Sequence, residues 1–197
     1  MNDIYLVKYS GTFGFIKPWT AVRDSETFSQ QFLTPSIVAG IERKLFPELL
    51  TDDDGEIHHI VGHRLSYRQI SQQQEVTQTR GWNKVRKGLH RDRSILTRGV
   101  MVEPELWLAF DTEEHAQRAA KQHICLCRNE DILLPSAEIT TTTRSVFDTD
   151  EEQYAGFELL FGEGEGAFLV GYNRFRQSAP MYGTIHIVGT PVKQHYE

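Results

Sequence analysis

The feature that most constrains this chain is a polar, strongly basic stretch in its middle, the 36 residues from His63 to Arg98. This stretch holds nine Lys or Arg residues but only Glu75 and Asp92 as acids, whereas the whole chain of 197 residues has a net charge of −6. The remainder of the chain therefore carries a net charge of −13. The basic stretch has too few apolar residues to form a core of its own. The core must therefore be built from the two parts of the chain that flank it.

The part before the basic stretch has the pattern of a strand, a helix and a second strand. Residues 4–9 are rich in β-branched and aromatic side chains, which is typical of a buried strand. Thr34 suits the N-cap of a helix, and Pro35 suits its first position, where the missing N–H costs nothing. Apolar residues then recur at helical spacing until Pro47, and residues 56–61 predict a short strand.

The part after the basic stretch repeats this order. Residues 106–110 predict a buried strand, and Asp111 with Glu114 three residues later fits a capping box at the start of a helix. A strand is then expected at residues 124–127. We interpret the glycine-rich loop 162–166 as a hairpin turn, with binding of a phosphate backbone through its N–H groups as the alternative. The tail contains four candidate strands, at residues 138–147, 154–161, 166–172 and 182–188.

These elements together predict an α+β fold. The order β-α-β-β-α-β is that of a ferredoxin-like (RRM-like) domain, here with an inserted basic thumb at about residues 63–98 and a C-terminal antiparallel β extension. We expect the ferredoxin-like domain to occupy residues 1–135, and the extension at residues 136–197 to pack on the same domain. The aromatic signatures of a standard RNA-recognition motif are absent, so base stacking on the sheet surface is not expected.

The sequence also bears on the compartment in which the chain works. No apolar run approaches 18 residues, so no membrane span is expected, and the first residues lack the pattern of a secretory signal. The two cysteines, Cys125 and Cys127, would point to opposite faces of a strand, so a disulfide between them is not expected. We therefore expect a cytoplasmic protein.

Residues 5–46 resemble the start of one family of CRISPR-associated proteins, the Cas-five branch of the repeat-associated (RAMP) superfamily. That family opens with a strand, a loop of Gly, aromatic and basic residues ending in Pro, and a helix entered through Pro. Residues 98–107 look like the strand that follows the family's inserted thumb, and residues 124–134 take the place of its last ferredoxin strand. The matching positions are Gly11, Phe13, Phe15, Lys17, Pro18, Thr34, Pro35, Ser36, Ala39, Gly40 and Ile41.

This resemblance implies a function in antiviral defence. The chain would be a non-catalytic subunit of a CRISPR ribonucleoprotein effector complex of the Cascade type. It would bind and cap the 5′ handle of the guide RNA and contact the backbone subunit, with no cofactor. Two alternatives stay open: a metal-independent endoribonuclease of the same superfamily that processes guide RNA, and a protein-only interaction module whose basic loop binds an acidic partner.

The basic stretch supplies most of the expected RNA contacts, because guanidinium groups bind phosphates in a bidentate manner and aromatic rings between them offer stacking surfaces. The alternative interpretation of the basic stretch is a solvated loop with no RNA contact. Lys17 and Arg23 lie near Phe13 and Phe15, which would either stack on handle nucleotides or belong to the core. The expected RNA-binding residues are Lys17, Arg23, Arg64, Arg68, Arg80, Trp82, Lys84, Arg86, Lys87, Arg91, Arg93 and Arg98.

No catalytic residue and no metal site are expected. If the chain cleaves RNA, His90 with Tyr67 and Lys87 are the candidates for the general base and acid, although no spacing forces the three together. Adjacent histidines such as His58 and His59 point to opposite faces of a strand, and no His/Cys pair has the spacing of a zinc site.

Overall fold

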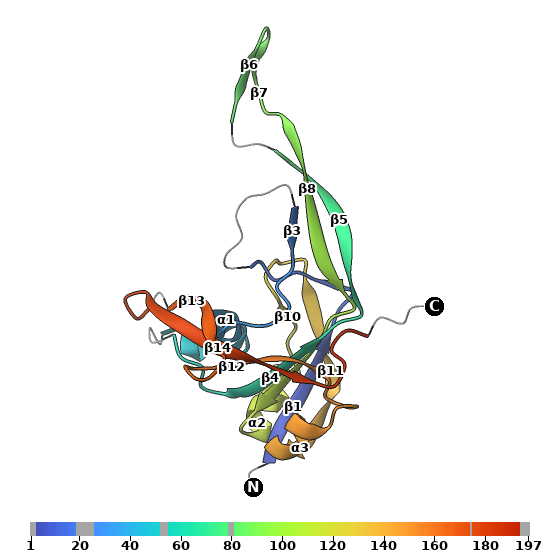
Figure 1. The fold of residues 1–197 in the computed structure, drawn as a ribbon, viewed down its shortest axis with the longest axis vertical. Coiled ribbons are helices and arrows are strands. Elements are labelled where there is room, and N and C mark those ends of the chain that lie inside the picture. Colours follow the sequence, from blue (N-terminus) through green and yellow to red (C-terminus); the bar gives the residue numbers. More distant parts are fainter. Residues whose placement is uncertain (1–2, 19–25, 52–54, 79–80, 174, 194–197) are drawn as a thin grey trace.

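The computed structural model describes residues 3–18, 26–51, 55–78, 81–173 and 175–193. It is an α+β protein in which one large sheet is continued by a long arm (Figure 1). The α+β class expected from the sequence is confirmed. In spatial order, the strands of the large sheet are β10 (Ile124–Cys125), β11 (Ile132–Thr143), β1 (Asp3–Ser10), β9 (Glu105–Phe110), β4 (Ile60–Ser66), β12 (Gly156–Phe161), β14 (Ala179–Val188) and β13 (Phe168–Asn173).

The remaining strands form the arm and its root. β8 is the central strand, with β5 on one side and the short strands β2 and β3 on the other, and β6 pairs with β7 alone. All pairs are antiparallel except β3 with β8, which is parallel. Their bounds are β2 (Phe13–Gly14), β3 (Glu26–Phe28), β5 (Gln69–Gln78), β6 (Asn83–Val85), β7 (Gly88–His90) and β8 (Arg93–Val102).

Helix α1 (Pro35–Leu45) starts as the sequence predicts, with Thr34 at the N-cap and proline in the first turn. Its apolar face buries Val38, Ile41 and Leu45, and a 3₁₀ turn (Pro47–Thr51) follows it. One residue on this face is polar: Glu42 is 1% exposed, and its carboxylate accepts hydrogen bonds from the backbone N–H groups of residues 58–60. Among the described residues, no helix combines the length and the apolar character that crossing a bilayer requires.

The central strands of the large sheet are covered on both faces. Because side chains alternate along a strand, the even residues of β9 face one way and the odd residues the other. Leu106, Leu108 and Phe110 pack with α1 and with helix α2 (Glu113–Ala119) in the main core. On the opposite face, Ala109 and Trp107 pack with Phe147 and Tyr154 from the region of helix α3 (Arg144–Thr149). Both faces of the central strands are therefore buried.

The structure corrects three details of the sequence analysis. The N-cap of α2 is Thr112, whose hydroxyl accepts from the N–H of His115, and not Asp111. The strand expected at residues 138–147 ends at Thr143, where α3 begins. The loop 162–166 is a turn but not that of a hairpin, because β14 lies between β12 and β13 and pairs with both. The first two corrections concern local helix N-caps, and the third concerns a strand pairing between distant parts of the chain.

Candidate nucleic-acid interface

The basic stretch forms an arm that projects from the body of the protein (Figure 1). Strands β5 and β8 pair along their whole length, from Gln69 opposite Val102 at the root to Gln78 opposite Arg93. At about 3.3 Å per residue, ten residues of strand span about 30 Å. β6 and β7 continue the ribbon as a small hairpin at its tip. We refer to residues 69–102 as the arm, and to its residues 81–93 as the tip.

The root of the arm is fixed by β2 and β3. β3 lies beside residues 97–99 of β8, and Phe28 packs directly onto the backbone of Gly99. A Cβ atom at position 99 would lie 2.2 Å from Cδ1 of Phe28, so only glycine allows this approach. β3 and Phe28 thus pack against the root of the arm.

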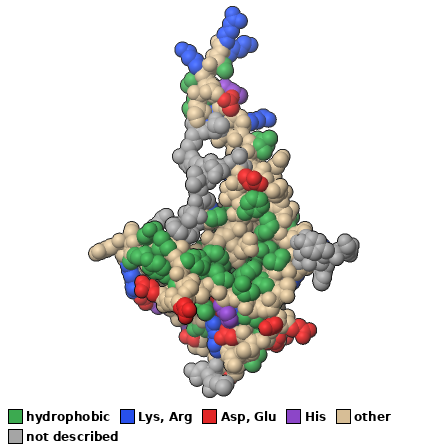
Figure 2. Space-filling view, in the orientation of Figure 1, with side chains coloured by type: hydrophobic (Ala, Val, Ile, Leu, Met, Phe, Trp, Pro, Cys, Tyr) green, Lys and Arg blue, Asp and Glu red, His purple; other side chains and the backbone are tan. Residues whose placement is uncertain are grey.

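The tip carries exposed cations. Arg86 and Lys87 form the two-residue loop that joins β6 to β7, and Gly88 after it has a φ of +137°, which favours glycine. Lys84 and Arg93 are exposed as well, and Figure 2 shows Lys and Arg side chains gathered at the end of the arm. The arm is several times longer than the screening length of about 8 Å at physiological salt, so the acidic body does not cancel this local charge.

A cation–π pair gives the tip a stacking surface. The guanidinium carbon of Arg91 lies 4.4 Å from the centroid of the Trp82 ring, and 55% of the Trp82 surface is exposed. Both groups are planar, and both can stack on a nucleic-acid base. The sequence prediction that aromatic and basic side chains are interleaved here therefore has a defined geometry at Trp82 and Arg91.

The cations at the root are engaged within the protein. Nε of Arg98 donates to Glu75 over 2.8 Å, and the Arg98 guanidinium lies 5.1 Å from the ring centroid of Phe15. Arg128 lies 5.4 Å from the same ring, which is 1% exposed. Phe15 thus belongs to the core, whereas Phe13 is 42% exposed.

Of the other expected RNA-binding residues, Arg68 and Lys17 are exposed, and two lie outside the described residues. Arg68 is exposed and pairs with Glu103 over 3.2 Å. Lys17 is exposed in the loop that follows β2. Arg23 and Arg80 lie outside the described residues, so the structure neither brings them to the arm nor separates them from it.

The assignment of Arg64 as an RNA contact is corrected by its position. It lies on β4, between β9 and β12, and is 0% exposed. Its Nη2 donates to Asp148 over 3.0 Å and to Glu158 over 2.9 Å. The neighbouring His63 is also buried, and this burial lowers its pKa to about 3. The first residues of the basic stretch, up to Ser66, therefore belong to the body, where the polar groups of His63 and Arg64 have a structural role.

The candidate catalytic residues are not brought together. Tyr67 lies at the root, 2% exposed, with its hydroxyl donating to Gln31 over 2.7 Å, and burial raises its pKa. His90 and Lys87 lie at the tip. The length of β5, about 30 Å, separates the two positions, which is far beyond the reach of a shared proton transfer.

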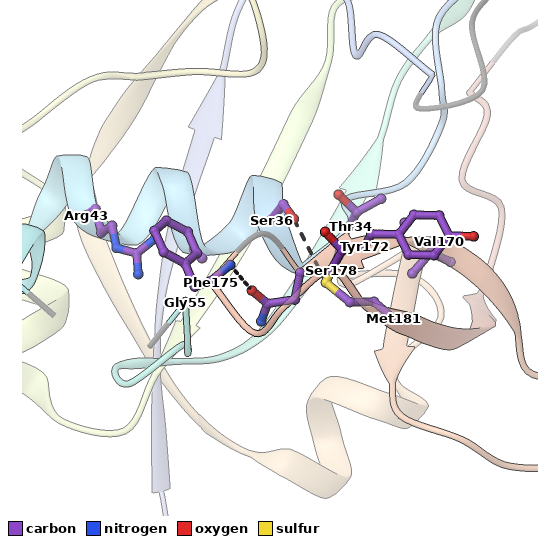
Figure 3. A pocket seen from close by; sticks show the side chains of 12 residues that line it. Thr34, Ser36, Arg43, Gly55, Val170, Tyr172, Phe175, Ser178 and Met181 are labelled. Carbon is purple, nitrogen blue, oxygen red and sulfur yellow. Dashed lines mark hydrogen bonds between the residues drawn. The ribbon is translucent and has the colours of Figure 1, made fainter. Parts of the chain in front are cut away.

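A groove that the sequence analysis missed lies between α1 and the β13–β14 hairpin, with a volume of about 750 Å³ (Figure 3). The Arg43 guanidinium lies 5.0 Å from the ring centroid of Phe175, and Tyr172 and Met181 add apolar surface. No carboxylate, imidazole or thiol is among the described residues that line it, so it has no set of groups for acid–base catalysis. The α1 wall and the β13–β14 wall lie more than a hundred residues apart in the chain, so no local sequence motif predicts this groove.

Comparisons with known proteins give little further information. No protein-family model matches the chain, and no curated protein sequence matches it. Among solved structures, the chain is similar to one described as "CRISPR RNA-guided surveillance complex", with 11% sequence identity and a TM-score of 0.48. The alignment covers 96% of this chain and 90% of that one. At this identity and TM-score, the likeness carries no inference about function, which we base on the residues and geometry of this chain.

Proposed function

We propose that this chain is a non-catalytic RNA-binding subunit of a cytoplasmic CRISPR ribonucleoprotein effector complex, where it binds and caps the 5′ handle of the guide RNA. The observation that carries the proposal is the arm: a ribbon of about 30 Å whose tip presents Lys84, Arg86, Lys87 and Arg93 to solvent. The sequence resemblance of residues 5–46 to the Cas-five branch supplies the identity of the RNA.

The topology of the body supports the same proposal. The elements β1, α1, β4, β9, α2 and β11 come in this order along the chain, with the short strands β2, β3 and β10, a 3₁₀ turn and the arm between them. The spatial order of their strands is β11-β1-β9-β4, and the neighbouring strands are antiparallel. This order supports the proposal of a ferredoxin-like β-α-β-β-α-β unit. On this reading, the arm is an insertion between its second and third strands, the place of the thumb in the resembled family.

The charge distribution indicates how the RNA is held. Phosphates attract Lys and Arg, and binding releases the counterions that surround the RNA. The tip bears five Lys or Arg residues and one Asp, whereas the rest of the chain is acidic. We propose that the tip grips the RNA while the acidic body faces protein neighbours, including the backbone subunit. The proposed RNA-binding residues are Lys17, Arg23, Arg68, Arg80, Trp82, Lys84, Arg86, Lys87, Arg91, Arg93 and Arg98.

The test is to purify the tagged protein from its native host and to sequence the 5′ ends of the RNA that accompanies it. Guide RNAs that share one repeat-derived 5′ end are the expected result. If no RNA is enriched at low salt while a stable protein complex is recovered, the protein-only interaction module replaces this proposal. If a repeat RNA is cleaved by the wild type but only bound by His90→Ala, the subunit is a nuclease.

A further inference from the structure

Three side chains from separate segments meet at the end of the body that lies opposite the arm. β4 and β9 pair with Ile60 opposite Phe110, so the residues just beyond these two positions, His59 and Asp111, lie at the same end of this strand pair. α2 begins immediately afterwards, and His115 lies one turn beyond Asp111. One donor atom from each of His59, Asp111 and His115 lies within 4.8 Å of the other two.

The positions of the two imidazoles are defined by their surroundings. Their ring centroids are 3.8 Å apart, with 35° between the ring planes. Phe46, which is fully buried, contacts both rings edge-on, with centroid distances of 4.7 Å to His59 and 5.4 Å to His115. Nδ1 of His115 lies 2.8 Å from Oδ1 of Asp111. The two imidazoles thus share an apolar floor formed by Phe46, and all three groups are at least partly exposed.

The segment that carries His59 is fixed from below by a buried carboxylate. Glu42 accepts the backbone N–H of His58, His59 and Ile60 at 2.5 to 3.0 Å. Such fixed backbone positions the His59 side chain before any ligand arrives, which is the role that supporting residues play around metal ions. Arg118 lies over the same Phe46 ring, and its charge is compensated by two hydrogen bonds to the Glu48 carboxylate.

We propose that His59, Asp111 and His115 form a binding site for a divalent transition-metal ion of the Zn²⁺ type. Two imidazoles and one carboxylate are ligands that Zn²⁺, Co²⁺ and Ni²⁺ accept. Three protein ligands leave a fourth position to water. Ligands at the usual bond lengths of about 2.0–2.2 Å around a tetrahedral ion are about 3.4 Å apart. The donor atoms lie within 4.8 Å of one another, so binding requires them to approach by at most about 1.4 Å.

From the sequence no metal site is expected, because adjacent His58 and His59 would point to opposite faces of a strand and no zinc-type spacing is present. Only one of the pair is needed, because the other two ligands lie more than fifty residues further along the chain. The ion would join the start of β4, the end of β9 and the start of α2. The remaining length of β4 and β9 separates it from the root of the arm, so it acts on the stability of the body and not on RNA contact.

The test uses the untagged full-length protein, treated with a chelator and then titrated with ZnCl₂ by isothermal calorimetry, with CoCl₂ as a spectroscopic probe. We expect one Zn²⁺ per chain, cobalt absorption bands of a site with nitrogen and oxygen ligands, and a rise in melting temperature of about 5–10 °C at a hundredfold excess over the dissociation constant.

His115→Ala and Asp111→Asn, which change partly exposed side chains, should each weaken Zn²⁺ binding at least tenfold, and His123→Ala, an exposed histidine outside the cluster, should not. Circular dichroism without metal verifies that each variant is folded. If His115→Ala is not folded, Asp111→Asn alone serves as the test of the site. Absence of stoichiometric binding, or equal loss in His123→Ala, would overturn the site. RNA binding by the apo protein reports on the proposed function separately.

Discussion

Removal of charge from the tip of the arm should change how RNA binding responds to salt. The perturbation is Arg86→Gln, Lys87→Gln and Arg93→Gln together, because all three side chains are exposed and glutamine keeps most of their length. For single-stranded nucleic acid, the logarithm of the binding constant falls with the logarithm of salt concentration by about 0.7 per phosphate contact. If each cation neutralises one phosphate, the slope should become shallower by about 2.

The consequence is measurable by fluorescence anisotropy with a labelled repeat RNA. Between 50 and 200 mM salt, the ratio of the wild-type binding constant to that of the triple variant should fall about 20-fold. This factor is the fourfold change in salt concentration raised to a power of about 2, the difference in slope. A matched triple variant, with Lys121, Arg176 and Lys193 changed to Gln on the body, removes the same net charge. Equal slopes for wild type and tip variant, or an equal change in the body variant, would refute the assignment of the tip as the RNA contact.

Three further predictions concern stability. Glu158→Ala should cost about 3–5 kcal/mol in urea denaturation, because it leaves the buried Arg64 guanidinium without its closest carboxylate; a loss below about 1 kcal/mol would contradict this. Burial holds the pKa of His63 near 3, so only the unfolded chain takes up this proton as the pH falls below about 6.5. The wild type should therefore lose about 2 kcal/mol more than His63→Gln between pH 7 and pH 5, and equal losses would argue against it. Gly99→Ala should destabilise the root of the arm by about 1–3 kcal/mol through its clash with Phe28, and Phe28→Ala in the same chain should recover part of that loss.

Local patterns predicted the elements best where their cause is local. Thr34 and Pro35 define the start of α1 through the chemistry of a helix N-terminus, and the structure starts the helix there. The run at residues 4–9 is a strand because its β-branched and aromatic side chains are buried, and β1 covers the same residues. The arm was expected from the lack of apolar residues, which prevents a separate core, and its strands β5 and β8 lie within and just beyond the basic stretch.

The candidate site was predicted in part, and the failures share one cause. Arg64 and Arg86 are both arginines of the same basic stretch, yet one is fully buried and the other exposed. The difference arises because the face of β4 that carries Arg64 is covered by the α3 region, where the Phe147 ring centroid lies 4.5 Å from the guanidinium carbon, whereas Arg86 lies in the exposed loop at the tip. The residues near Arg64 in the sequence do not predict that the Oε2 atom of Glu158, more than ninety positions away, lies 2.9 Å from Nη2 of Arg64.

The sequence by itself determined that the chain has a basic stretch within an otherwise acidic chain and an α+β order of elements, because charge and hydrophobic periodicity are properties of neighbouring residues. Only the tertiary structure decided which cations reach solvent, which strands flank β14, and that His59, Asp111 and His115 meet. Those outcomes depend on contacts between residues far apart in the chain. Strand pairing and burial bring such residues together.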